Sequence, residues 1–261
     1  MFKITNEYLD LDQIADSGQV FRWRKLEDGY LLIATDKAVV ATQEGNEITV
    51  FCDGDEEYWR NYLDLSTDYG KIIASIDTDD DFLIKASDAG KGIRILRQDF
   101  FEMLVSFIIS QNNNIPRIKK TIEGLCEGFG IKKQVGDETY YAFPTIEQLK
   151  GKSLEGFGLG YRQRYLEKLI SDGVDEKYFK SLDFIEAKKQ LKSIVGVGEK
   201  VACCVALFGL HHLEAFPIDT WMKKIQNEIY HGNFDLENYG KYAGVIQQYM
   251  FYYARIGGYH G

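Results

Sequence analysis

The sequence is poor in cysteine and proline. Its 261 residues include four cysteines and three prolines. No C-x-x-C pair occurs, and Cys203 and Cys204 are adjacent, so the usual ligand spacings of zinc and iron–sulfur sites are missing. We therefore expect reduced thiols, no metal centre and no required cofactor.

Long hydrophobic runs are missing too. No segment approaches the ~18 uninterrupted apolar residues that a membrane-spanning helix needs. Residues 1–10 lack the charged-then-apolar pattern of a secretory signal. These absences predict a cytoplasmic protein without a membrane partner.

The charge is negative but unevenly distributed. The net charge of −9 argues against indiscriminate binding to nucleic acid. Residues 1–90 carry 8 basic and 20 acidic residues, whereas residues 91–261 carry 23 basic and 20 acidic residues. A phosphate backbone could therefore dock on the second part of the chain.

The residue pattern predicts an α+β fold. Residues 30–52 are rich in β-branched residues on both sides of a turn-like EGNE, which indicates an antiparallel hairpin or meander. After about residue 97 the pattern becomes helical. We expect an N-terminal antiparallel β domain over residues 1–90, a helical domain over 91–198, and helices over 199–261 that complete a second lobe of an all-helical body.

Several helices are expected from apolar spacing and capping residues. Their expected ranges are 98–110, 183–194, 220–230 and 239–256, and Thr145 with Gln148 forms a capping box.

The segment LKSIVGVGEKVACCVAL reads as helix, tight turn, helix. Gly196 and Gly198 permit a positive φ and a close approach of another backbone. The second helix should begin at Glu199, where free amides, such as that of Val201, can hold a phosphate. This is the pattern of a helix–hairpin–helix, although any helical hairpin with a glycine turn would share it.

Lys200 falls in the first turn of that second helix. The helix dipole opposes a positive charge there and should lower the pKa of the amine. Only a neutral lysine is a nucleophile, and with its ordinary pKa of ~10.4 a lysine is almost entirely protonated at pH 7. Lys200 is therefore a candidate for Schiff-base chemistry, with a surface lysine on a phosphate as the alternative.

Asp219 follows Pro217 and precedes the expected helix 220–230. Aspartate is a favoured N-cap residue, which is enough to explain it. A carboxylate in that place also stays ionised and could stabilise positive charge on a neighbouring sugar. An antiparallel return of the chain would bring Lys200 and Asp219 together.

These residues resemble the helix–hairpin–helix DNA glycosylases, in which G-[VI]-G-x-K-V-A is followed by P-[VI]-D. Further segments resemble the 8-oxoguanine DNA glycosylase/AP lyases of that superfamily. In chain order they are SGQVFRW (Ser17–Trp23), SQNNNIPRI (Ser110–Ile118), GLGYRQRY (Gly158–Tyr165) and YAGVIQQYMF (Tyr242–Phe251).

The resemblance implies an enzyme that acts on double-stranded DNA containing 8-oxoguanine, opposite cytosine. Lys200 would attack the deoxyribose C1′ and form a Schiff base, and Asp219 would stabilise the oxocarbenium-like transition state. The imine would then acidify the C2′ proton, so that β-elimination cuts the strand 3′ to the abasic site.

The resemblance also implies how the base is recognised. The flipped base would lie between Cys204 and Phe251, and Gln247 would pair with its Watson–Crick edge. The backbone carbonyl of Gly18 would accept the N7–H of 8-oxoguanine and repel the N7 acceptor of guanine. Without the resemblance, an ordinary amphipathic helix explains Gln247 and Phe251 equally well.

A third group of residues matches positions around the opposite base. Asn112, Arg117 and Arg162 would fill the vacated space and hold the orphaned cytosine, and Tyr161 would be the wedge. The arginines could alternatively contact phosphates only.

Two positions depart from the family pattern. Many members have a histidine two residues after the aspartate and an acid near the end of the last helix, where this chain has Trp221 and Ala254. We expect Trp221 at the DNA phosphate together with Gly196, Gly198 and Val201.

A monovalent cation at the hairpin carbonyls is a further expectation. The compact chain predicts a prokaryotic, nucleoid-associated monomer.

Other functions are weaker interpretations. Glycosylases for oxidised pyrimidines or mispaired adenine usually carry a four-cysteine cluster near the C-terminus, and no cysteine follows Cys204. Alkylbase glycosylases lack the lysine at position 200. A non-catalytic DNA-binding module would not need Lys200, Asp219, Gln247 and Phe251 together. A lysine aldolase would need repeating βα units, and the strands here end early.

Overall fold

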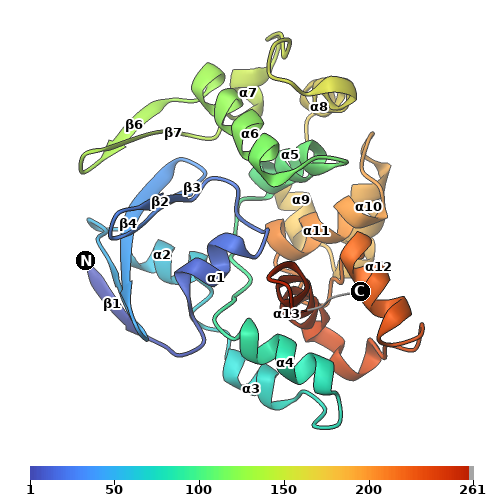
Figure 1. The fold of residues 1–261 in the computed structure, drawn as a ribbon. Coiled ribbons are helices and arrows are strands. Elements are labelled where there is room, and N and C mark those ends of the chain that lie inside the picture. Colours follow the sequence, from blue (N-terminus) through green and yellow to red (C-terminus); the bar gives the residue numbers. More distant parts are fainter. Residues whose placement is uncertain (259–261) are drawn as a thin grey trace.

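The N-terminal part of the chain forms an antiparallel sheet (Figure 1). The computed structural model describes residues 1–258. The strand order is β1–β5–β4–β3–β2, and every neighbouring pair is antiparallel. The strands are β1 (Phe2–Thr5), β2 (Arg24–Leu26), β3 (Gly29–Ala34), β4 (Lys37–Glu44) and β5 (Glu47–Val50). The meander expected over residues 30–52 is therefore confirmed.

Two helices share the hydrophobic cluster of this sheet, α1 (Leu11–Asp16) and α2 (Glu56–Tyr62). Asp10 caps α1, because its side chain accepts a hydrogen bond of 2.8 Å from the amide of Gln13. The cap and the buried helix fix the start of the loop that follows α1. That loop carries Gly18.

The rest of the described chain is mainly helical, which confirms the α+β fold. Its α-helices are α3 (Tyr69–Ala74), α4 (Asp81–Ala89), α5 (Phe100–Ser110), α6 (Ile115–Phe129), α7 (Ile146–Leu149), α8 (Gln163–Asp172), α9 (Glu176–Ser181), α10 (Phe184–Ser193), α11 (Glu199–Gly209), α12 (Thr220–Glu228) and α13 (Ala243–Arg255). Two 3-10 helices are η1 (Gly160–Arg162) and η2 (Glu237–Tyr242).

Helix α5 lies at the centre of the helical body and packs along α11 (Figure 1). Its residues Phe100–Ile109 are all buried. Among them, Glu102 accepts a hydrogen bond of 2.9 Å from the amide of Thr35 and pairs with the buried guanidinium of Arg22 at 3.5 Å. The Glu102 contacts therefore connect α5 to the N-terminal sheet region, while its packing connects it to α11.

Two features differ from the sequence expectation. A two-stranded hairpin, β6 (Lys132–Val135) and β7 (Glu138–Tyr141), interrupts the part that was expected to be all-helical. The last helix, expected over residues 239–256, begins only at α13. The residues before it form η2, whose backbone departs from helical geometry at Gly240.

The hydrophobic clusters do not divide at residue 90. Helices α3 and α4 lie within the first expected domain, yet Ile72 and Leu83 belong to the same cluster as α5, α11 and α13. Helix α4 also packs directly against α13. The domain boundaries at residues 90 and 198 stay a prediction.

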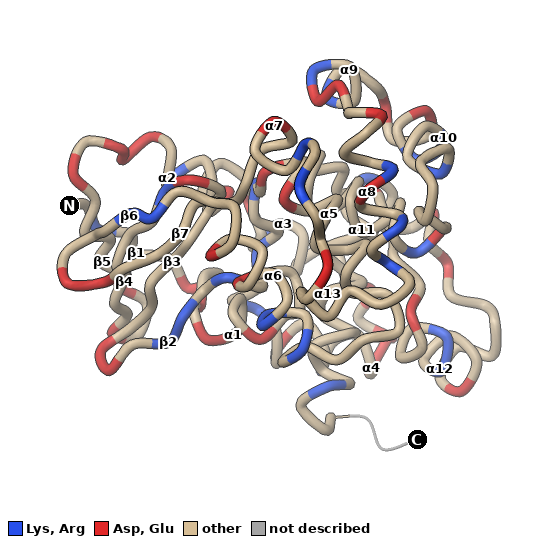
Figure 2. The backbone as a smooth tube through the Cα atoms, turned by 90° about the horizontal axis from the view of Figure 1, so that it is seen from above, with Lys and Arg blue, Asp and Glu red and all other residues tan. Residues whose placement is uncertain are grey.

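The backbone view in Figure 2 places acidic positions in the outer loops of the sheet and basic positions on α6 and α12. Within residues 1–258, none of the helices combines the length and the apolar character that a membrane crossing requires.

Candidate active site

One cavity brings together six residues that the sequence singled out. They come from the loop after α1, from α11, from the start of α12 and from α13: Gly18, Lys200, Cys204, Asp219, Gln247 and Phe251. The cavity has a volume of about 50 Å³, and its other lining residues are Ser17, Phe107, Phe208, Pro217 and Gln248. Four distant segments therefore meet at one point, while the roles of their residues stay predictions.

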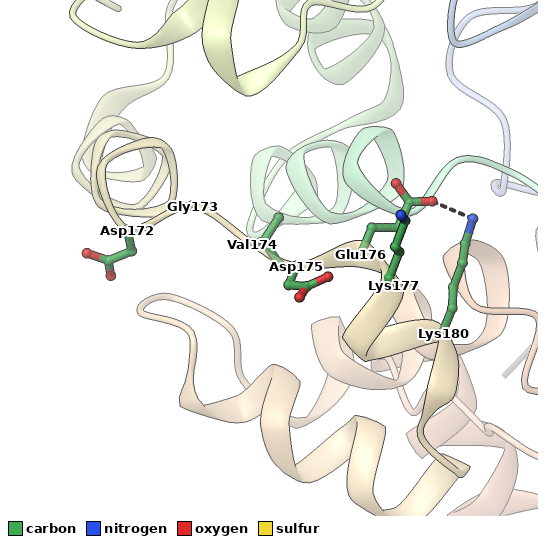
Figure 3. Close-up of a pocket in the computed structure, with 7 residues that line it drawn as sticks. All are labelled: Asp172, Gly173, Val174, Asp175, Glu176, Lys177 and Lys180. Carbon is green, nitrogen blue, oxygen red and sulfur yellow. Dashed lines mark ion pairs between the residues drawn. The ribbon is translucent and has the colours of Figure 1, made fainter.

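A larger hollow lies elsewhere. It has a volume of about 790 Å³ and lies at the connection between α8 and α9. Figure 3 shows the residues that line it, with an ion pair between Glu176 and Lys180. None of the candidate residues lines it. Volume alone would therefore have pointed away from the cavity that the predicted site residues line.

Lys200 is half-buried in the first turn of α11. Its Nζ lies 5.2 Å from the ring centroid of Phe107, within the range of a cation–π contact. Among residues 1–258 it has no ion-pair partner. Lys200 also borders a hollow of about 620 Å³ that is lined by residues of α10, α11 and α12. The amine thus stands between two hollows, next to an aromatic ring.

Cys204 lies one helical turn after Lys200 and is buried. Burial raises the pKa of its thiol, and the neighbouring Lys200 partly opposes this shift. The thiol is therefore neutral near pH 7 and offers a packing surface rather than a nucleophile.

Asp219 is the N-cap of α12. Its Oδ1 accepts a hydrogen bond of 2.9 Å from the amide of Met222. Its Oδ2 has no hydrogen-bond partner within residues 1–258, so one carboxylate oxygen is free for the cavity. Trp221 is 38% exposed beside it, with the Lys224 Nζ 5.8 Å from its ring centroid.

Gly18 lies directly beneath Phe251. Its φ of +81° is in the left-handed region, and a Cβ there would lie 3.1 Å from the Phe251 ring. Arg255 stabilises the contact between the loop and α13, because its Nη1 donates a hydrogen bond of 2.6 Å to the carbonyl of Asp16. Its guanidinium also lies 5.5 Å from the Phe251 ring centroid. The loop and α13 are thus held together at the cavity.

The start of α11 differs from that of most other helices. Aspartate or asparagine side chains cap α1, α5, α6, α10 and α12, whereas Gly198 at the N-cap of α11 has no side chain to do so. The first intrahelical bond runs from Ala202 to Gly198 at 2.9 Å. The amides of Glu199, Lys200 and Val201 are left without an intrahelical acceptor, which suits an anion.

Gly196 makes the turn of the hairpin. Its φ is +87°, and a Cβ there would lie 2.4 Å from Tyr165, so no other residue fits without displacement. Its carbonyl accepts a hydrogen bond of 3.0 Å from the side-chain amide of Gln111. Within residues 1–258, no group of three or more His, Cys, Asp or Glu side chains could hold a metal ion. A monovalent cation at the hairpin carbonyls stays an expectation.

The predicted opposite-base residues lie together on two neighbouring segments, which are the α5–α6 connection with the first turn of α6 (Asn112 and Arg117) and η1 (Tyr161 and Arg162). Tyr161 is 44% exposed, and its hydroxyl accepts a hydrogen bond of 3.2 Å from Asn112. Arg117 donates to the carbonyl of Gly158 at 3.1 Å.

Arg162 is only 5% exposed, in contrast to Tyr161. Its guanidinium donates to the carbonyls of Gln111, Asn112 and Leu159. In this conformation Arg162 joins η1 to the α5–α6 connection, and contact with a cytosine would require some of these bonds to be exchanged.

Sequence reasoning missed three side chains at the site: Gln111, Gln248 and Arg255. Gln111 stands inside the quoted SQNNNIPRI segment, and Gln248 is adjacent to Gln247, so position alone could have marked them. Arg255 bonds to a residue 239 positions away in the sequence, and no local pattern reveals such a contact.

The chain is similar in sequence to known DNA glycosylases and lyases. Residues 1–104 match the family model described as "8-oxoguanine DNA glycosylase, N-terminal domain". The chain is 27% identical to a probable N-glycosylase/DNA lyase of Methanothermobacter thermautotrophicus, over 95% of this chain and 94% of that protein. It is 31% identical to the N-glycosylase/DNA lyase of Saccharomyces cerevisiae, over 87% of this chain and 70% of the yeast protein.

The fold is also similar to a solved structure with bound DNA. That structure is the Clostridium acetobutylicum 8-oxoguanine glycosylase/lyase in complex with double-stranded DNA that has cytosine opposite 8-oxoguanine. The two chains are 38% identical and superpose with a TM-score of 0.90, over 97% of this chain and 94% of the clostridial one.

Proposed function

The chain belongs to the 8-oxoguanine DNA glycosylase/lyase family, and we propose that its cavity excises 8-oxoguanine opposite cytosine from duplex DNA and then cleaves the strand. The observation that carries this proposal is the convergence of Gly18, Lys200, Cys204, Asp219, Gln247 and Phe251 on one cavity. A purely DNA-binding module needs the hairpin amides but not this cavity.

The reaction begins when the Lys200 amine, in its neutral form, attacks the C1′ carbon of the flipped nucleotide. The bond between C1′ and the base breaks, and the base leaves with a proton. Asp219 lines the same cavity, and its carboxylate stabilises the positive charge that develops on the sugar. The proton that leaves with the base is one of the two amine protons. The ring oxygen O4′ then takes up a proton as the sugar ring opens, which gives a protonated Schiff base.

The second step cleaves the strand. The protonated imine withdraws electrons from C2′, so that a proton leaves C2′ and the C3′–oxygen bond breaks, with the phosphate as leaving group. The exposed amides at the start of α11 support this step by holding a nearby DNA phosphate, with Gly196, Gly198, Val201 and Trp221 as the proposed contacts. Asn112, Arg117, Tyr161 and Arg162 would meanwhile stabilise the opened duplex around the cytosine.

Borohydride trapping tests the proposal. The protein is mixed with duplexes that carry 8-oxoguanine opposite each of the four bases, and a covalent adduct is scored on a denaturing gel. We expect the adduct with cytosine opposite the lesion, and Lys200→Gln should abolish both the adduct and strand cleavage while lesion binding persists. Lys168→Gln, at an exposed position of α8, is the control and should leave adduct formation and strand cleavage unchanged.

Trapping also separates the alternatives. A binding module would give no adduct with any duplex. A glycosylase for another base would give an adduct only when that lesion replaces 8-oxoguanine. Cleavage near the wild-type rate in Lys200→Gln would contradict the assignment of the nucleophile.

We further propose that the protein works as a monomer in the cytoplasm of a prokaryotic cell, associated with the nucleoid through DNA. One chain supplies every residue of the cavity, which supports a monomer. Light scattering of the protein with and without a lesion duplex tests this: a mass of one chain per duplex is expected, and two chains per duplex would contradict it. We also propose that a monovalent cation binds the hairpin carbonyls and that the protein requires no other cofactor.

A further inference from the structure

Two adjacent glutamines of α13 line the cavity and are bonded to each other. Gln247 is 2% exposed and Gln248 is 3% exposed. The Nε2 of Gln248 donates a hydrogen bond of 3.0 Å to the Oε1 of Gln247. The Oε1 of Gln248 is buried and has no hydrogen-bond partner within residues 1–258. The bond to Gln247 is thus the one side-chain hydrogen bond that Gln248 makes in the described chain.

This bond couples the orientations of the two amides, so that the Gln247 amide can turn only if the Gln248 amide turns with it. The oxygen and the nitrogen of a glutamine amide are nearly equal in size, so a half-turn exchanges an acceptor for a donor at little steric cost. With Gln248 donating, Gln247 must present its oxygen to it, because the turned amide would place two NH₂ groups against each other. One lone pair of Oε1 and both N–H donors of Gln247 then remain for a ligand.

The orientation matters because purines differ in what they present to such an amide. The Watson–Crick edge of 8-oxoguanine carries an O6 acceptor beside an N1–H donor. The edge of 8-oxoadenine carries an N6–H donor beside an N1 acceptor, so its order is reversed. A freely turning amide can pair with either edge, whereas an amide held in one orientation pairs with only one of them.

We propose that Gln248 is a specificity-determining positioning residue, which holds the Gln247 amide in the orientation that pairs with 8-oxoguanine and not with 8-oxoadenine. This inference rests on the proposed function of the cavity and on base pairing by Gln247. Oε1 accepts N1–H while Nε2 donates to O6. A wrong base leaves two buried acceptors or two buried donors facing each other, which is costly in a dry site.

The comparison of 8-oxoguanine with 8-oxoadenine isolates this effect. Both bases carry the C8 carbonyl and the N7–H, so the proposed contact with Gly18 is the same for both. Only the edge that faces Gln247 differs. Single-turnover excision is therefore measured on matched duplexes with each base opposite cytosine, and the ratio of the two rates is the readout.

Two variants change the bond in different ways. Gln248→Glu keeps the size, and its ionised carboxylate offers acceptors only, so the Gln247 amide should turn its NH₂ toward position 248 when the excision is measured at a pH at which this carboxyl is ionised. We expect the ratio of 8-oxoguanine to 8-oxoadenine excision to fall by about tenfold or more, the effect of one mismatched buried pair. Gln248→Met removes the bond without favouring the opposite orientation and should give a smaller fall.

Tyr249→Phe is the matched control. Tyr249 follows Gln248 in α13, and its buried hydroxyl also lacks a partner within residues 1–258, but it does not line the cavity. Its removal should leave the ratio unchanged. Borohydride trapping on a preformed abasic site, which has no base to recognise, is measured in parallel to distinguish a loss of base recognition from a general loss of activity. Circular dichroism and urea unfolding confirm an intact fold in both Gln248 variants.

An unchanged ratio in Gln248→Met, or in a folded Gln248→Glu, would overturn the proposal and reduce Gln248 to a packing residue. An equal loss on both bases and on the abasic site would do the same. Failure of the wild-type protein to excise 8-oxoguanine would instead overturn the proposed function, so the two failures are distinguishable.

Discussion

The side-chain amide of Gln111 donates a hydrogen bond of 3.0 Å to the backbone carbonyl of Gly196. This bond joins the end of α5 to the turn of the hairpin, although the two residues are 85 positions apart in the sequence. The carbonyl of Gln111 in turn accepts from Arg162. Gln111 therefore links the predicted opposite-base segments to the hairpin that carries the predicted nucleophile.

Loss of this link should impair catalysis on duplex DNA. Gln111→Leu removes the amide at nearly constant volume, so we expect the free energy of unfolding to fall by about 1 kcal/mol. Single-turnover excision should slow down more than this loss of stability explains. Gln134→Leu is the matched control, because its amide also bonds a glycine carbonyl at 3.0 Å but lies in the β6–β7 hairpin. Equal excision rates for the two variants would contradict the link.

The uncapped start of α11 gives a second prediction, in which stability and binding move in opposite directions. Gly198 has ordinary extended geometry, and a Cβ there would meet nothing within 4 Å. Gly198→Ser should supply a cap and raise the free energy of unfolding by a few tenths of a kcal/mol, up to about 1 kcal/mol. Its hydroxyl would compete for the amides that hold the phosphate, so DNA affinity should fall.

Gly198→Ala controls for added bulk, because it brings a Cβ but no capping oxygen. Urea unfolding and fluorescence anisotropy with a lesion duplex measure the two quantities. If Gly198→Ser bound DNA as tightly as Gly198→Ala, the phosphate role of these amides would be wrong.

The parts of the fold that follow from local signals were predicted correctly. The start of α11 at Glu199 follows from the glycine turn before it, and the β3–β5 meander follows from β-branched runs around EGNE. The β6–β7 hairpin was missed because its strands are four residues long and lie between helices. An alternating pattern of four residues is too short to indicate a strand between two segments with helical spacing.

The site was predictable only in part, for a related reason. Lys200 and Asp219 are marked by a helix start and a helix cap, which are local features. Gly18 and Phe251 meet only in the folded chain, so the family resemblance was needed to connect them. The bonds of Arg162 and Arg255 to distant backbone carbonyls leave no periodic trace in a sequence.

Arg117 provides a third prediction. Its backbone amide is capped by Asn114 at the start of α6, while its exposed guanidinium bonds the carbonyl of Gly158 and no other group within residues 1–258. Arginine donors suit the O2 and N3 acceptors of cytosine, so Arg117→Ala should lower the ratio of excision rates for lesions opposite cytosine and opposite adenine by about tenfold. Lys120→Ala, on the same helix, is the control for lost charge. A ratio that does not move would show that Arg117 contacts phosphate only.

Acid stability should depend on Asp64, whose buried side chain accepts hydrogen bonds from Arg97 at 2.9 Å and Tyr69 at 3.0 Å. His211 lies 3.3 Å away. Burial tends to raise the pKa of the Asp64 carboxyl, but the hydrogen bond and charge of His211 and the charge of Arg97 help to outweigh it, so the pKa lies below its ordinary value of 3.8. The carboxylate therefore contributes stability that is present above about pH 4 and is lost as the pH falls through the lowered pKa.

Asp64→Asn isolates this charge, because asparagine has the same size and tolerates the left-handed φ of 50° at this position. We expect the free energy of unfolding at pH 7 to fall by about 2 kcal/mol, since the variant leaves Arg97 without its carboxylate. Below about pH 4 the gap between variant and wild type should narrow, because protonation removes the same charge from the wild-type protein. Urea unfolding at a series of pH values measures the loss of stability at pH 7 and its narrowing in acid. Asp172→Asn, at an exposed position of α8, is the control. A gap that stays constant down to about pH 2 would mean that the Asp64 charge has no part in acid unfolding.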